Sequence, residues 1–188
     1  MYKVRDYEIK TSINEMTIAE FESISALLKN ESLETIERYF EVLEFLGVPE
    51  AILDELTDEE LFNAIKSFNT QAASKELKPS FELGGYTYRA YEDGTEFSLK
   101  ARDLSYIEKA AKTQTAWLSY IMAIIFKRED LGKSEHYADA HIKFKAKIFG
   151  ELNAGEYYPY MLAVTERINQ QITNYVKTTG ADNGVPAE

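Results

Sequence analysis

The sequence contains no cysteine and no long apolar segment, and both absences narrow what the protein can be. Without cysteine there is no disulfide framework, no thiolate zinc site and no cysteine nucleophile. The most apolar run, Ala116–Phe126, spans 11 residues, whereas a membrane-spanning helix needs about 20. The run therefore predicts a buried helix, and we expect no membrane contact. Residues Met1–Lys10 are charged and lack the apolar stretch of a signal peptide, so we expect the chain to stay in the cytoplasm of the cell that makes it.

Basic residues are in the minority: 21 Lys and Arg stand against 32 Asp and Glu, for a formal net charge of −11. An acidic surface repels phosphate, which argues against nucleic acid and anionic lipid as partners. The imbalance lies mainly in residues 1–79, where 17 acidic residues face 8 basic ones (net −9), while residues 80–188 hold 15 and 13 (net −2). A partner that docks on the N-terminal half is therefore predicted to be basic.

Apolar residues recur at helical spacing through most of the chain, which predicts a mainly helical protein. Two of the predicted helices open with a capping box, in which a Thr hydroxyl and a Glu carboxylate satisfy backbone donors reciprocally. The pairs are Thr17 with Glu20 and Thr57 with Glu60. The predicted helices span about residues 18–28, 32–46, 58–68, 104–111, 117–126, 136–149 and 157–177.

The second of these helices has two contrasting faces. Its apolar face is predicted to point inward, and its other face is acidic and exposed. Gly47 followed by Pro49 is typical of the residues just beyond a helix C-terminus. The inward side holds Leu33, Ile36, Phe40 and Leu43, and the exposed side holds Glu34, Glu37, Glu41 and Glu44.

Gly84-Gly85 stands between two short β-prone runs and predicts a tight hairpin. A loose alternation in Tyr2–Ile13 predicts one further strand. The expected fold class is therefore α+β and mainly α, with six to seven helices and one small antiparallel hairpin.

The domain organisation has two interpretations. In the first, an acidic helical half (residues 1–70) is joined by a linker (71–79) to a hairpin and a second helical half (80–177), and residues 178–188 form a flexible tail. In the second, the whole chain folds as one compact domain. Its length suits either arrangement.

No motif for catalysis or for cofactor binding emerges. His136 and His141 are five residues apart, so on one helix they diverge instead of sharing the face that a chelating pair at spacing three or four would share. Gly84-Gly85 lacks the spacing of a phosphate-binding loop. Paired carboxylates such as Glu59-Glu60 are expected in any acidic chain, and none is marked as desolvated. We therefore predict no catalytic residue, no metal site, no cofactor and no enzymatic activity.

Two clusters leave alternatives open. Tyr157, Tyr158 and Tyr160, grouped around Pro159, form either an exposed partner-binding patch or the core-facing start of a helix with Pro159 near its first position. The lysines of Lys143–Lys147 form either a solvated helix face or a phosphate-binding patch, and acidic neighbours favour the solvated face.

Several short segments, taken in order, resemble a family of small tailed-phage proteins known as tail assembly chaperones or virion morphogenesis proteins. The resemblance covers most of residues 13–170. Its opening segment, Met16–Phe21, is similar to a helix opening of that family, and Met122–Arg128 is similar to an apolar stretch that ends in a basic residue. The other matching segments are Leu46–Pro49, Asp58–Leu61, Lys78-Pro79, Phe97–Leu99, Tyr106–Glu108, Lys145–Phe149 and Leu162–Val164.

The resemblance implies a non-enzymatic role in phage assembly. A tail assembly chaperone holds the hydrophobic tape-measure protein soluble while tail protein polymerises around it. The implied partners are therefore phage tail or virion proteins, in the host cytoplasm. The alternative is a structural virion protein, such as a ring or adaptor subunit at the head–tail junction, and homo-oligomer formation stays open for either. No functional residue is carried over from the family, and Tyr157, Tyr158 and Tyr160 are the partner-binding candidates.

Overall fold

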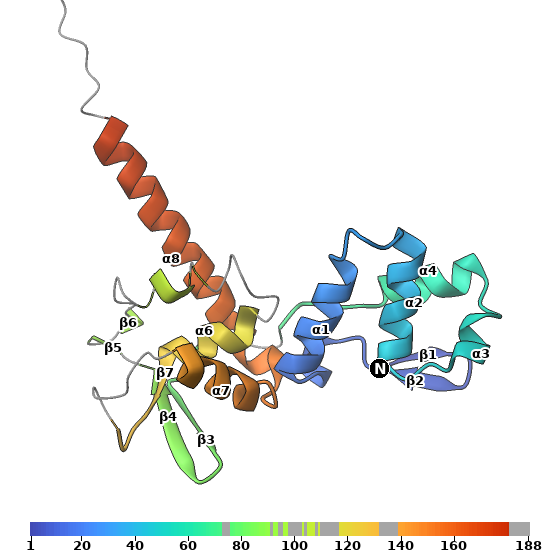
Figure 1. Cartoon of the computed structure of the whole chain (residues 1–188), viewed down its shortest axis with the longest axis horizontal. Coiled ribbons are helices and arrows are strands. Elements are labelled where there is room, and N and C mark those ends of the chain that lie inside the picture. The colour runs from blue at the N-terminus through green and yellow to red at the C-terminus, as the bar shows by residue number, and fades with distance from the viewer. Residues whose placement is uncertain are drawn as a thin grey trace, which may run out of the picture.

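The computed structural model is α+β and mainly helical, as predicted, but its described residues form eight helices, the 3-10 helix included, where six to seven were predicted (Figure 1). The structure describes residues 1–72, 76–90, 92–93, 96–97, 103, 105–107, 109, 117–131 and 139–180. Its elements are β1 (Tyr2–Val4), β2 (Tyr7–Ile9), the 3-10 helix η1 (Ile13–Glu15), α1 (Ile18–Leu28), α2 (Thr35–Phe45), α3 (Glu50–Leu53), α4 (Asp58–Lys66), β3 (Ser80–Leu83), β4 (Tyr86–Ala90), β5 (Glu92–Asp93), β6 (Glu96–Phe97), α6 (Trp117–Ile125), β7 (Phe126–Arg128), α7 (Asp139–Phe149) and α8 (Ala154–Gly180).

The first residues form a hairpin where one strand was predicted. Strands β1 and β2 pair antiparallel with Val4 opposite Tyr7, so Arg5 and Asp6 make a two-residue turn. Arg5 adopts the left-handed region (φ 52°), which usually selects Gly or Asn in such turns. Its guanidinium donates to the Glu55 carboxylate at 2.7 Å. That tertiary contact holds the turn in place of a turn-forming residue, which is why the sequence pattern missed it.

The two predicted capping boxes are present. The Thr17 hydroxyl accepts from the Glu20 N–H at 3.2 Å, and the Glu20 carboxylate accepts from the Thr17 N–H at 2.8 Å. The same reciprocal pair joins Thr57 and Glu60 at the start of α4. Helix α2 begins at Thr35, three residues later than predicted. Gly47 adopts φ 90° beyond its end, as a glycine after a helix C-terminus does.

The predicted hairpin at Gly84-Gly85 is also present. Both glycines have positive φ (59° and 78°), and Leu83 pairs with Tyr86 across the turn. The hairpin is one part of a three-stranded antiparallel sheet in the order β3-β4-β7, because β7 adds beside β4 directly after α6. A further short pair, β5-β6, follows β4. The prediction of a single hairpin was therefore wrong, since β7 joins the sheet through a pairing that is distant in sequence.

The largest core lies between this sheet and helices α6, α7 and α8. Helix α6 is buried along most of its length, and Phe126, Phe149 and Tyr160 are among its largest fully buried neighbours. The side chain of Phe81 packs against several of these rings, with centroids 4.9 Å from Phe126 and 5.1 Å from Phe149. Helix α8 packs on this core through its first turns and then projects away from it (Figure 1).

A second core lies among β1, β2, α2, α3 and α4, and α1 stands between the two (Figure 1). Ile18 of α1 belongs to the large core, whereas Ile24 packs with Met16 and Val42 in a small cluster against α2. The first amides of α1 donate to the loop between α7 and α8: Ile18 N–H to the Leu152 carbonyl at 2.8 Å, and Ala19 N–H to the Gly150 carbonyl at 2.9 Å. Residues that are distant in sequence therefore fix where α1 begins.

The predicted linker, residues 71–79, contains no helix or strand at the positions that the structure describes, namely 71–72 and 76–79. Residues 73–75 lie outside the described residues. Contacts cross between the halves nonetheless, since Ile13 and Ile18 lie in the core built mainly by residues after 80. Helix α8 includes residues 178–180, so the predicted tail begins inside it, and 181–188 lie outside the described residues. Among the described helices, none is long and apolar enough to cross a membrane.

Gly155, near the start of α8, lies against η1. A Cβ added at Gly155 would lie 2.8 Å from the Asn14 Cα and closer still to the Asn14 amide oxygen, and the backbone atom is unable to move as a flexible side chain does. We expect Gly155→Ala to lower the free energy of unfolding by about 1–3 kcal/mol through overpacking. Urea unfolding monitored by circular dichroism measures this. Thr165→Ala, at an exposed α8 position, is the matched control and should change stability little. Equal stability of both variants would contradict the contact.

Candidate functional site

The structure places two of the three candidate tyrosines in the core. The side chains of Tyr157 and Tyr160 are 3% and 1% exposed, and their rings pack on Phe81 and Phe126 with centroids 5.3 Å and 5.0 Å apart. Tyr158 is half-buried against Phe21 of α1. The exposed-patch interpretation is therefore corrected, because a partner has no access to Tyr157 or Tyr160 on the folded surface.

The position of the helix start explains why the tyrosines are buried. Helix α8 begins at Ala154, and the Asn153 side chain accepts from the Glu156 N–H at 3.1 Å. Pro159 therefore lies inside the helix, not at its first position as predicted. The three tyrosines therefore lie on the helical turns of α8 that pack against α6 and η1. Burial raises the pKa of Tyr157 to about 12, and the Tyr160 hydroxyl donates to the Lys78 carbonyl at 2.6 Å.

Glu22 is a desolvated carboxylate that the sequence analysis did not identify. It is buried on α1 and reaches the N-terminal turn of α6, where its oxygens accept from the Ser119 N–H at 2.7 Å and the Ser119 hydroxyl at 2.8 Å. Burial raises its pKa above the ordinary glutamate range. In the sequence, Glu22 stands four residues after Ile18. This spacing places it on the apolar side of α1, and it is the signal from which its burial can be predicted. With each oxygen engaged by α6, Glu22 serves as a cap supplied from another helix.

The other titratable candidates are dispersed. Among the residues that the structure describes, no group of three His, Asp or Glu side chains is placed to hold a metal ion. His141 lies on α7, and His136 is outside the described residues. Glu60 caps α4, and Asp130 pairs with Arg128. These carboxylates therefore have structural partners, and no site for a cofactor is formed among them.

The lysines of α7 divide between its two sides. Lys145 is buried and donates to the Phe126 carbonyl at 2.5 Å, so the predicted solvated face is wrong for this residue. Lys143 and Lys147 are exposed and lie one turn apart. Between them Phe144 is 63% exposed, although it is a large apolar side chain. We call Lys143, Phe144 and Lys147 the basic face.

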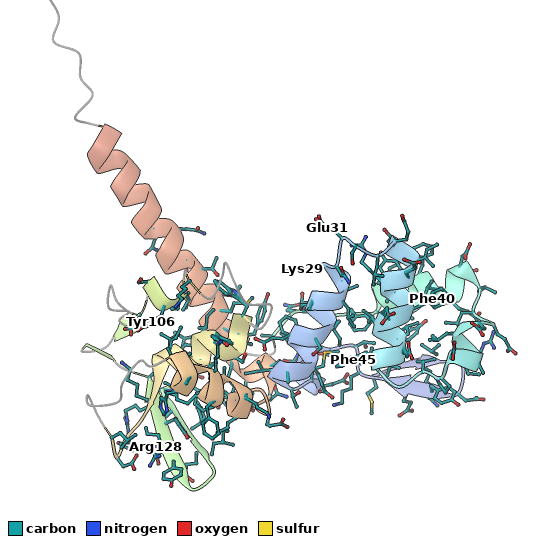
Figure 2. All side chains as sticks on the ribbon, viewed as in Figure 1. Lys29, Glu31, Phe40, Phe45, Tyr106 and Arg128 are labelled. Atoms are coloured by element: carbon teal, nitrogen blue, oxygen red, sulfur yellow. The ribbon has the colours of Figure 1, made fainter. Side chains whose placement is uncertain are left out.

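A second exposed apolar group lies on α2 and α4. Ile36 is 46% exposed and Phe62 is 40% exposed, and the half-buried Tyr39 joins the two helices with its ring 5.9 Å from that of Phe62. Phe40 lies on the side of α2 turned away from α1 (Figure 2). The sequence predicted Ile36 to be buried. Ile36 is exposed because it lies in the first turn of α2, whereas Leu43, two turns later on the same side of the helix, reaches the core.

Exposed glutamates flank this apolar group. On α2, Glu37 and Glu44 lie three residues before and four residues after Phe40, and on α4 Glu59 lies three residues before Phe62. We call this surface the acidic face. It lies in the part of the chain that carries a net charge of −9. The protein thus presents two exposed apolar surfaces with flanking charges of opposite sign. The acidic face consists of Ile36, Phe40 and Phe62 with Glu37, Glu44 and Glu59.

The burial of Tyr160 is tested by two substitutions. We expect Tyr160→Ser to lower the free energy of unfolding by about 3–5 kcal/mol, because it leaves a cavity in the large core. Tyr160→Phe keeps the ring and loses only the hydroxyl contact with Lys78, at a cost of about 1 kcal/mol. Thermal and urea unfolding measure both. A Ser variant as stable as the Phe variant would show that the ring is not a core residue.

The buried Glu22 carboxylate predicts a pH-dependent difference in stability. Because burial raises its pKa in the folded chain, folding is favoured by protonation, and its contribution to stability falls as pH rises from the unfolded value near 4.5 through the raised folded value. Glu22→Gln stays neutral while keeping an acceptor for Ser119. We therefore expect the variant to gain stability relative to the parent chain as pH rises above 4.5 in urea titrations. A difference that does not change with pH would contradict this.

Comparisons with known proteins give no family for the chain. No family model, no curated protein and no solved structure matches it. The resemblance to tail assembly chaperones therefore stays a prediction from short motifs. What the protein does has to be inferred from its own surfaces.

Proposed function

We propose that the protein acts by binding other proteins, as a non-enzymatic phage morphogenesis protein. The first candidate function is that of a tail assembly chaperone, which binds the tape-measure or tail protein in the host cytoplasm during assembly. The observation that carries the proposal is the acidic face, where Ile36, Phe40 and Phe62 lie among glutamates. Exposed apolar groups rimmed by charge are typical of protein-binding surfaces.

The chemistry of the acidic face fits a basic amphipathic helix. Such a helix buries its apolar side against Ile36 and Phe62, while its Lys or Arg side chains approach Glu37 and Glu59. Aromatic side chains contribute strongly at the centre of such contacts, and the charges around them guide association. The net charge of −9 in this part of the chain favours a basic partner and repels acidic ones.

The absence of enzymatic activity is part of the proposal, and the surroundings of Glu22 support it. General acid–base chemistry needs a carboxylate that reaches a substrate. Glu22, whose pKa is raised by burial, directs its oxygens at Ser119. A carboxylate held in this way organises the fold.

The second candidate function is a structural virion protein, such as a ring or adaptor subunit. One observation favours it: the chain carries two exposed apolar faces with opposite charge, one on α2 and α4 and one on α7. A subunit that contacts two neighbours at once needs two such surfaces. A chaperone that releases its client needs only one.

Quantitative mass spectrometry of purified particles and of infected-cell lysate separates the two functions. For a chaperone we expect the protein to be abundant in lysate and absent from mature particles. A fixed copy number per particle would instead establish the structural role. Absence from particles together with no association with any tail or virion protein in lysate would overturn both.

The acidic face is tested by copurification with the tape-measure or tail protein of the same phage. We expect Ile36→Ser/Phe62→Ser to reduce the copurified tail protein at least tenfold, because the apolar centre of the face is lost. Leu162→Ser is the matched control, since Leu162 is an equally exposed apolar residue (52%) on α8. Equal loss in both variants would show that the effect is not specific to the acidic face.

A further inference from the structure

We propose that the acidic face of one copy of this chain binds the basic face of a second copy, so that the protein assembles head to tail. The inference deepens the second candidate function, that of a structural subunit, by naming a second copy as the occupant of the acidic face, and it rests on the proposed claim that these faces make protein contacts. It does not depend on the phage assignment. The observation behind it is that glutamates flank the exposed apolar residues of one face, whereas lysines flank the exposed ring of the other.

The two faces are complementary in arrangement as well as in charge. On α7, Lys143 and Lys147 lie one turn apart, and the exposed ring of Phe144 lies between them along the helix. On α2, Glu37 and Glu44 lie on either side of Phe40. When α7 of one copy lies along α2 of another, the exposed Phe144 ring covers exposed Ile36 and the outer edge of half-buried Phe40, and the lysines approach the glutamates. Both apolar groups then leave water together.

Within the part of the chain that the structure describes, neither face is covered. Phe144 is 63% exposed, and Ile36 and Phe62 are 46% and 40% exposed, in the same structure. The faces also belong to different parts of the molecule, because α7 packs on the large core and α2 and α4 enclose the second one. One chain therefore has both surfaces open at the same time.

Charge also decides the symmetry of the contact. Two acidic faces repel each other, and so do two basic faces, so a two-fold dimer that uses the same face on both copies is disfavoured. The remaining contact pairs unlike faces, and in head-to-tail assembly each copy offers its acidic face to one neighbour and its basic face to another. An unsubstituted protein that stops at a dimer, with both contacts closed between the same two copies, would overturn this arrangement. Heterologous contacts build closed rings or open filaments. The assembly is therefore expected to exceed two chains.

Two one-sided variants test this inference by sedimentation velocity. Lys143→Glu/Phe144→Ser/Lys147→Glu disables the basic face, and Ile36→Ser/Phe62→Ser disables the acidic face. The unsubstituted protein should sediment above the mass of two chains at high concentration, and each variant alone should sediment as one chain. An equimolar mixture should give a dimer and nothing larger, because one intact acidic face and one intact basic face remain. Leu162→Ser should assemble like the unsubstituted protein.

Several results would overturn the inference. These are an unsubstituted protein that stays a single chain at millimolar concentration, variants that assemble as it does, or a mixture that stays as single chains. If a variant loses helical circular dichroism, the charge-only pair Lys143→Glu/Lys147→Glu and Glu37→Lys/Glu44→Lys replaces it. Each of those alone should be a single chain, and their mixture should assemble again.

Failure here is distinguishable from failure of the proposed function. A single-chain protein that still copurifies with tail protein through Ile36 and Phe62 overturns head-to-tail assembly and leaves the proposed function standing. In that outcome the occupant of the acidic face is a segment of the tail protein. Head-to-tail assembly without any tail or virion partner overturns the proposed function and keeps this inference.

Discussion

Helix α1 has to pack against two separate cores, and the rest of the structure depends on that double contact. Its N-terminal turn is built on the loop between α7 and α8, whose carbonyls accept the first amides of the helix. Its other side meets α2 through Ile24 and Val42. Glu22, between these contacts, caps α6 with a buried carboxylate. A burial cost at Glu22 is offset by the backbone and hydroxyl donors that it satisfies. Helix α1 thereby couples the start of α6 to the acidic N-terminal elements.

Because the apolar core is divided in two, parts of α2, α4 and α7 face solvent. The second core is small: α4 packs on it with one side, and α2 packs on it through Leu43 and on α1 through Val42, so the remaining sides of both helices face solvent. Helix α7 does the same on the large core: Ile142, Ala146 and Phe149 are buried, and Phe144 is left outside. The apolar residues are thus exposed because each core is covered by one layer of helices, whose outer sides face solvent. Whether such residues can bind a partner depends on the charges around them. Lysines flank Phe144, and mainly glutamates flank the apolar group on α2 and α4, where Lys66 stands one turn after Phe62.

Local patterns predicted several elements whose stabilising contacts are local, although the capping boxes at Ser12 and Glu34 were not predicted. The capping boxes at Thr17 and Thr57 and the hairpin at Gly84-Gly85 involve residues within a few positions of one another, and all three are present. The turn at Arg5 was missed because Glu55 holds it from a distance. Strand β7 was missed for the same kind of reason, since it pairs with β4 across a long sequence separation. Contacts of this type leave no periodic signal.

The exposure of the candidate site was also mispredicted, and the residues involved show why. The tyrosines around Pro159 were chosen because aromatic rings gather there, yet that part of α8 has few charges beside the rings and packs into the core. Phe144 and Phe62 were not among the candidates, although Lys143 and Lys145 stand beside Phe144 in the sequence and Glu59 stands one helical turn before Phe62. A helix buries one continuous stripe, so an apolar residue surrounded by charges on the helix surface lies outside that stripe. Phe144, with lysines beside it and one turn after it on α7, is exposed, whereas Tyr157 and Tyr160, which stand in a cluster of aromatic residues, are buried.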